Sequence, residues 1–155
     1  MTDLSDNPGV RFPPPVLYAL AVLGGFLLNG KWPLPVGDRF LVSLVAAILG
    51  AGSVALAVAS VGRFRRAGTT VIPRRTATAF VISGPYRFTR NPMYLSMTGL
   101  TVGLGLLFNT WWPTLLLVPV LTIVRFAVIS REERYLRRRF GADYETYTRQ
   151  VRRWL

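Results

Sequence analysis

Three long runs without charged residues divide the chain and predict membrane-spanning helices. Residues 12–30, 40–62 and 91–124 contain no Asp, Glu, Lys or Arg. A helix needs about 20 apolar residues to cross the hydrocarbon core of a bilayer. The first run opens with three prolines, so its helix is expected at 16–30 and is short. The second run predicts one full span.

The third run is too long for a single span and predicts a helical hairpin. Asn109-Thr110-Trp111-Trp112-Pro113 interrupts it. Proline is favoured at the start of a helix and tryptophan at a membrane interface. We therefore expect helices at 92–108 and 112–130. The predicted fold class is all-α: a polytopic membrane protein of about four transmembrane helices, followed by C-terminal cytoplasmic helices.

The residues after 130 predict helices in water. Gly141 is expected to end the first of these as a C-cap, and Asp143 to cap a second helix over 144–154. An apolar stripe on that second helix would lie on the membrane surface or against the bundle. The members of the stripe are Tyr144, Tyr147, Val151 and Trp154. We expect one domain over 1–155, with two spans in 1–62 and the remaining elements in 63–155.

The charge distribution predicts the topology. The chain has 19 Lys+Arg against 7 Asp+Glu, a net charge of +12. Seven arginines fall in 63–90 and eight in 131–155. Because cytoplasmic loops carry excess Lys and Arg, both segments and both termini are expected in the cytoplasm, near anionic lipid headgroups. A nucleic-acid partner is a distant alternative, since the apolar residues form long runs rather than short amphipathic elements.

The chain contains no His and no Cys. This excludes a His-based catalytic triad, His metal ligands, a thiolate zinc site and a Cys nucleophile. We therefore expect no metal. Chemistry must use the remaining polar side chains or a cofactor.

One candidate site lies directly before the third predicted span. Residues 83–94 combine turn residues with Tyr86, Arg87, Arg90 and Tyr94. Asn91 is suited to the N-cap of the span and Pro92 to its first position. A helix N-terminus attracts a carboxylate or phosphate. The alternative is a capped helix with interfacial aromatic residues and topology-setting arginines.

Glu132, Glu133 and Arg125 form a second candidate. The glutamates follow the fourth predicted span, where the helix dipole disfavours them, so a compensating cation is expected. That cation is either a local arginine such as Arg137 or a ligand. Arg125 lies inside the apolar run and shares a helix face with Glu132. It either has a function at membrane depth or extends to nearby headgroups.

Two glycine pairs have a structural interpretation. Gly50 with Gly52 and Gly103 with Gly105 follow no predicted strand and lack the remaining glycine of a dinucleotide motif. Small residues allow membrane helices to approach closely, so we expect these pairs at helix contacts.

Several motifs in this order resemble the integral-membrane methyltransferases that include isoprenylcysteine carboxyl methyltransferase and the phospholipid N-methyltransferases. The motifs are Phe64 to Pro73, Gly84 to Tyr94, Glu132-Glu133 and Phe140 to Tyr147. The resemblance covers about residues 50–155. It implies a helical membrane enzyme that uses S-adenosylmethionine, with a cytoplasmic cofactor pocket and a lipid substrate that enters from the bilayer.

The resemblance also implies roles for individual residues. It places Arg90, Asn91, Pro92, Tyr94, Glu132 and Glu133 at the cofactor. We expect Glu132 or Glu133 to bind the cofactor ammonium, and Arg87, Arg90 and the helix start at Asn91 to bind its carboxylate. Tyr86 and Tyr94 would form walls of the pocket. Arg125 and Glu133 are the expected catalytic residues, with Arg125 facing the reacting centre.

The chain departs from the isoprenylcysteine pattern at three positions. Asn91 stands where those enzymes usually have His, Ser96 where Gly is common, and Val128 where they have Arg. Phospholipid methyltransferases can carry Asn-Pro-Met-Tyr, as here. The acceptor therefore stays open between an isoprenylcysteine-like carboxylate and a phospholipid amine. The alternative functions are an NADPH-dependent membrane reductase similar to sterol reductases and a non-enzymatic lipid-binding membrane protein.

Overall fold

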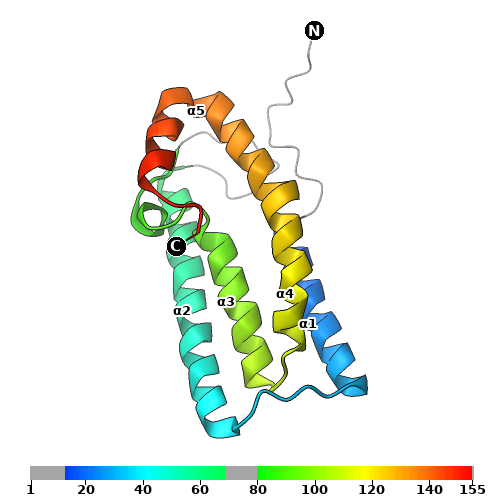
Figure 1. Ribbon diagram of the computed structural model, residues 1–155. Helices are drawn as coiled ribbons and strands as arrows, with labels where there is room; N and C mark the ends of the chain where they lie inside the picture. The colour runs from blue at the N-terminus through cyan, green and yellow to red at the C-terminus, as the bar shows by residue number, and fades with distance from the viewer. Residues whose placement is uncertain (1–12, 69–79, 155) are drawn as a thin grey trace.

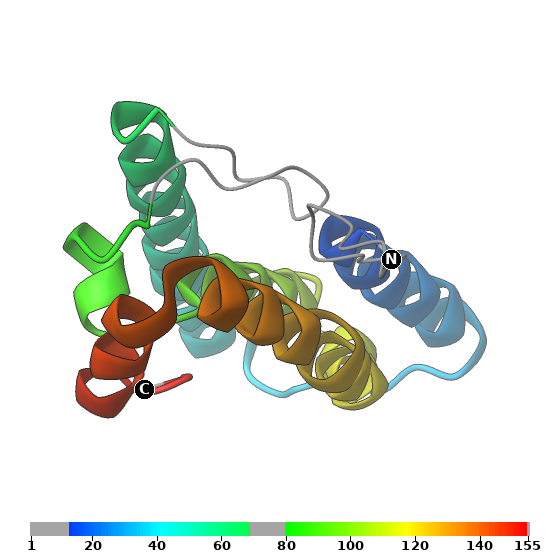
Figure 2. The same ribbon diagram turned by 90° about the horizontal axis from the view of Figure 1, so that it is seen from above.

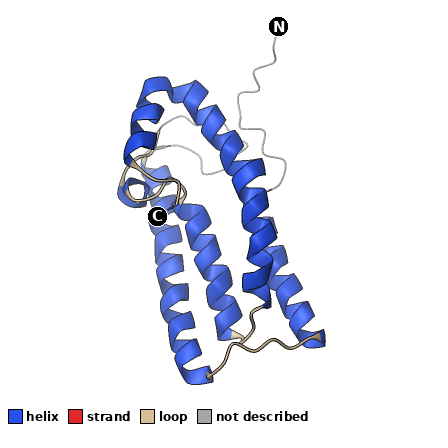
Figure 3. Ribbon diagram, in the orientation of Figure 1, coloured by secondary structure: helices blue, strands red, loops and turns tan. Residues whose placement is uncertain are grey.

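The computed structural model describes residues 13–68 and 80–154, and every regular element within them is helical (Figure 3). The helices are α1 (Pro14–Lys31), α2 (Arg39–Arg66), the short 3-10 helix η1 (Gly84–Arg87), α3 (Pro92–Leu107), α4 (Trp112–Ile123), the π-helix η2 (Val124–Ile129) and α5 (Ser130–Gln150). The predicted all-α class is confirmed for the described residues.

The four long apolar helices lie alongside one another, in an order that differs from their order in the sequence. Helix α3 packs against α2, and α1 packs against both α3 and α4, so α3 and α4 lie between α1 and α2 (Figure 1). Helix α4 continues through η2 into α5, which extends beyond the bundle and turns back toward η1 (Figure 2).

Two helices are long and apolar enough to cross a membrane. These are α2, with 28 residues, and the continuous helix from Trp112 to Gln150. Only 11% of the apolar part of α2 is buried inside the protein; Phe40, for example, is 77% exposed. An apolar surface of this extent favours lipid over water as its surroundings. Helices α1 and α3 have 18 and 16 residues, so the four-span arrangement stays a prediction.

The expected hairpin is present, and an asparagine forms its turn. The backbone of Asn109 is left-handed, with φ of 52°, and the N–H of Thr110 donates to the carbonyl of Gly105 at 2.8 Å. Asparagine tolerates this conformation better than most residues. Its Oδ1 also accepts from the N–H groups of Val36 and Gly37. The turn between α3 and α4 is thereby fixed to the loop between α1 and α2.

Glycines allow the helices to approach closely, which confirms the prediction for Gly103 and Gly105 but not for Gly52, where an added Cβ would meet nothing within 4 Å. A Cβ added to Gly103 in α3 would lie 3.4 Å from the backbone of Ala46 and of Gly50 in α2. Gly25 makes a closer contact, because its Cβ would lie 2.6 Å from the backbone nitrogen of Pro113 in α4. These contacts fix the spacing of the helices.

Gly141 interrupts α5, as expected. Its φ of 49° and ψ of −123° bend the helix. Beyond the bend, Tyr144, Tyr147 and Val151 pack against Phe80, Leu136 and Phe140, so the stripe lies against the protein. The prediction that this helix extends to 154 is wrong. It ends at Gln150, because residues 151–154 run separately and bind the loop before α3.

The π-helix η2 was not predicted. A π-helix closes hydrogen bonds five residues apart and inserts about one extra residue into a helix. Here the hydroxyl of Ser130 donates to the carbonyl of Arg125, five residues earlier, at 2.9 Å. π-Helical turns are frequent at functional sites, and this one directly precedes the two glutamates.

Candidate active site

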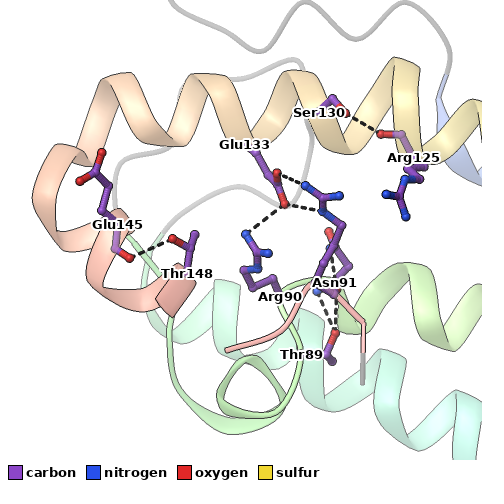
Figure 4. Close-up of polar contacts among 9 residues, drawn as sticks. Thr89, Arg90, Asn91, Arg125, Ser130, Glu133, Glu145 and Thr148 are labelled. Carbon is purple, nitrogen blue, oxygen red and sulfur yellow. Dashed lines mark hydrogen bonds and ion pairs between the residues drawn. The ribbon is translucent and has the colours of Figure 1, made fainter. Parts of the chain in front are cut away.

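Glu133 is buried and lies between two arginines from distant parts of the chain. Its Oε1 is 3.1 Å from Nη1 of Arg90, which precedes α3 (Figure 4). Arg153 donates to both carboxylate oxygens, from Nε at 2.9 Å and from Nη2 at 2.7 Å. Such a two-bond contact is strong and directional. We expected a local arginine such as Arg137, or a ligand, to balance the charge of Glu133, but Arg90 and Arg153 do so instead. Arg137 is exposed.

Glu132 has a different environment from its neighbour. Its Oε1 accepts a hydrogen bond of 2.8 Å from the phenol of Tyr94, a neutral donor in the first turn of α3. Burial, together with the nearby carboxylate of Glu133, raises the pKa of Glu132 to about 7, although the hydrogen bond from Tyr94 opposes the shift. Glu132 is therefore a carboxylate that lacks sufficient stabilisation of its charge.

Pro92 begins α3, as predicted, but Asn91 does not cap the helix with its side chain. The amide of Asn91 instead donates to the carbonyl of Arg153 at 2.9 Å. The backbone N–H of Arg90 donates to the carbonyl of Arg152 at 2.9 Å, and that of Asn91 to the Thr89 hydroxyl. The backbone N–H groups of Arg90 and Asn91 are thus already paired and Pro92 has none, so these three residues offer no backbone donor to a carboxylate.

Residues 151–154 form a C-terminal strap over the start of α3. Two carbonyls of the strap hold residues 89–91, since the hydroxyl of Thr89 also donates to the carbonyl of Arg153. Trp154 packs against the apolar cluster that contains Tyr94 and Val128. No pattern in the sequence distinguishes Arg153, because it is one of eight arginines after residue 130. Only its position in space marks it.

Tyr86 is buried on the other side of the strap. Its carbonyl accepts a hydrogen bond of 2.6 Å from the phenol of Tyr147, and its ring packs edge-on against Phe64 at 5.4 Å. Burial raises the pKa of the Tyr86 phenol, so it stays neutral at ordinary pH. Arg87 follows in η1 and is exposed. The structure thus brings Tyr86 to the site but leaves Arg87 at its edge.

Arg125 stands apart from these contacts. In Figure 4 it projects from the helix on the same side as Glu133 but takes no part in the ion pairs of the cluster. Its side chain is exposed, and the guanidinium carbon lies 5.6 Å from the centre of the Phe126 ring. Val128, at the position where the isoprenylcysteine pattern has an arginine, is fully buried in the core.

The residues of this cluster are suited to a ligand that carries both a positively and a negatively charged group. The cluster combines two carboxylates with two guanidiniums and the phenol of Tyr94. In addition, Nε of Arg90 is buried and has no hydrogen-bond partner among the described residues. A buried donor without a partner is costly, so an acceptor supplied by a ligand would stabilise it.

The helices and this cluster define a helical membrane-type protein with a polar site at one end of its bundle. A family model described as phospholipid methyltransferase matches residues 39–143. The chain therefore belongs to this family of methyltransferases. No curated protein and no solved structure matches the chain. The matched region includes Arg90, Tyr94 and both glutamates, and it ends before the C-terminal strap.

Proposed function

We propose that this protein transfers a methyl group from S-adenosylmethionine to a lipophilic acceptor within the membrane. The observation that carries the proposal is the difference between the neighbours of the Glu132 and Glu133 carboxylates. Among the described residues, no cation pairs with Glu132, while Glu133 lies against two guanidiniums. The methionine end of S-adenosylmethionine carries an ammonium and a carboxylate, so it would find an oppositely charged partner on each side.

Glu132 is the better candidate for the cofactor ammonium. Both oxygens of Glu133 already accept hydrogen bonds from Arg153, and Arg90 adds a third contact. Glu133 would instead hold Arg90 in place beneath the cofactor. Arg90, with its free Nε, would bind the carboxylate, and Arg87 would contribute from the edge of the site. Tyr86 and Tyr94 would form walls of the pocket, and Asn91 and Pro92 would fix its base.

The chemistry requires alignment rather than a strong acid or base. When bound, S-adenosylmethionine would supply a methyl group activated by a sulfonium: the acceptor lone pair would form a bond to the methyl carbon in line as the S–CH3 bond breaks, and S-adenosylhomocysteine would leave with that electron pair. The protein contributes by positioning the two reactants and excluding water. Arg125, exposed at membrane depth on the same side of the helix as Glu133, would contact the polar end of the acceptor. A chain without His or Cys is sufficient for this reaction.

A phospholipid amine is the acceptor that the family favours. The match to the phospholipid methyltransferase model agrees with the sequence Asn-Pro-Met-Tyr at 91–94. Exposed apolar side chains on α2 and α4 would face the lipid from which the acceptor enters. We place the site on the cytoplasmic side of four spans, because the arginine-rich segments flank it. An isoprenylcysteine carboxylate is the second candidate acceptor.

Transfer of label from methyl-labelled S-adenosylmethionine tests the proposal. Detergent-purified protein is incubated with total membrane lipid, and the labelled product is identified. We expect label in a phospholipid headgroup, and little label with Glu132→Gln. Glu145→Gln, an exposed position on α5, is the matched control. If the wild-type protein neither transfers label nor binds S-adenosylhomocysteine in calorimetry, the proposal is wrong.

A further inference from the structure

The surroundings of the two glutamates differ in net charge: positive around Glu133 and negative around Glu132. Glu133 carries one negative charge and contacts two guanidiniums, so its group has one positive charge in excess. The adjacent Glu132 carries a negative charge when ionised and is bonded to the neutral phenol of Tyr94. Within the described residues, an excess cation therefore lies next to a carboxylate that no cation pairs with. This arrangement is complementary to a zwitterion such as the α-amino acid end of a ligand.

Of the two guanidiniums, that of Arg153 is the one free to change partner. Its side chain is 30% exposed, against 15% for Arg90. The backbone of Arg153 is fixed independently of its side chain, because Thr89 and Asn91 donate to its carbonyl. The guanidinium can therefore turn away from Glu133 without displacing the strap. Arg90 would stay on Glu133 and keep that buried carboxylate compensated.

We propose that Arg153 binds the carboxylate of the cofactor's amino acid end, exchanging Glu133 for the ligand. This inference rests on the proposed function and extends its site beyond the region that the family model matches. The exchange replaces one charge-assisted pair with another, so little electrostatic stabilisation is lost. Arg153 is thus a binding residue contributed by the C-terminal strap, in addition to Arg90.

Calorimetry with two ligands tests this assignment. S-adenosylhomocysteine has the amino acid end, whereas 5′-methylthioadenosine lacks it. We expect Arg153→Met to weaken binding of S-adenosylhomocysteine by about 10- to 100-fold, the range of a charge-assisted contact. Binding of 5′-methylthioadenosine should stay within about twofold, because the adenosine end makes no use of Arg153. Arg152→Met removes the exposed neighbouring guanidinium and should leave both affinities as they are.

The same substitution in a Glu133→Gln protein shows whether Arg153 binds the ligand directly or acts only by holding Glu133 in place. If Arg153 acted only by holding Glu133, Arg153→Met would have no effect in a Glu133→Gln protein. We expect the loss of S-adenosylhomocysteine affinity to persist there. Equal losses for both ligands, or no loss for either, would overturn the inference while the proposed cofactor site stands. If the wild-type protein binds neither ligand, the proposed function fails and the inference with it.

Discussion

The phenol of Tyr94 donates to Oε1 of Glu132 at 2.8 Å and joins the first turn of α3 to the first turn of α5. The same tyrosine accepts a hydrogen bond at its carbonyl from the phenol of Tyr18 in α1. Three helices thus meet at one residue next to the candidate site. The hydrogen bond from its phenol joins α3 to α5 and opposes the rise that burial causes in the pKa of Glu132.

The affinity for S-adenosylhomocysteine should rise with pH. The pKa of Glu132 is raised to about 7, so its carboxylate gains charge between about pH 6 and pH 8. Only the charged form attracts the ligand ammonium. We expect tighter binding at the higher pH in calorimetry, and a flat profile for Glu132→Gln.

Tyr94→Phe should move this pH profile. The hydrogen bond from Tyr94 lowers the pKa of Glu132, so removing it shifts the midpoint to higher pH. The fold should tolerate the change, because the aromatic ring that packs in the core is kept. An unchanged midpoint in Tyr94→Phe would show that Glu132 does not control binding.

Glu133→Gln should destabilise the protein. Removing the charge leaves two guanidiniums close together in a mostly buried position, and breaking such pairs costs about 3–5 kcal/mol when burial is complete. Since Arg153 is partly exposed, we expect about 2–3 kcal/mol. The measurement is thermal unfolding in detergent. Glu145→Gln on the exposed surface of α5 is the control and should leave the melting temperature within a degree or two.

Gly25→Ala should disturb the contact between α1 and α4. The new Cβ would lie 2.6 Å from the backbone of Pro113, which cannot move aside as a flexible side chain can. Overpacking of this kind costs about 1–3 kcal/mol. Gly30→Ala is the matched control in the same helix, because nothing lies within 4 Å of its Cβ. Equal melting temperatures for the two variants would contradict the close packing.

Single cysteines in this cysteine-free chain test the four-span topology. Pro35→Cys and Arg138→Cys place thiols at exposed positions in the α1–α2 loop and in α5. A membrane-impermeant maleimide should label position 35 in intact cells and position 138 only after permeabilisation. If α2 and α4 were the only spans, both positions would lie on the same side of the membrane.

Much of the fold follows from the sequence because lipid-facing helices have a simple composition. The bounds of α2 match its charge-free run within four residues, and those of α3 match the predicted helix 92–108 within one. Asn109 and Gly141 break the helices where turn residues predict breaks. The π-helix has no such signal. An extra residue in a helical turn leaves the apolar pattern of 124–129 unchanged.

The candidate site is predictable only in part. The motif residues Arg90, Tyr94, Glu132 and Glu133 come together, as their spacing and the resemblance suggested. The partners of Glu133 did not follow from the sequence, since local spacing favoured Arg137 and the structure gives Arg90 and Arg153. Contacts between distant segments depend on the path of the chain, here on the reversal at Gly141, and no short-range pattern records that path.

The reversal of α5 at Gly141 also determines when the site is completed during synthesis. The helices that hold Tyr94, Arg90 and the two glutamates leave the ribosome before the strap that binds them. Domains generally begin to fold from the N-terminal side as the chain emerges. In a chain arranged in this way the proposed cofactor site would be completed after the apolar helices are made, so we expect a chain that stops before the strap to be inserted but inactive.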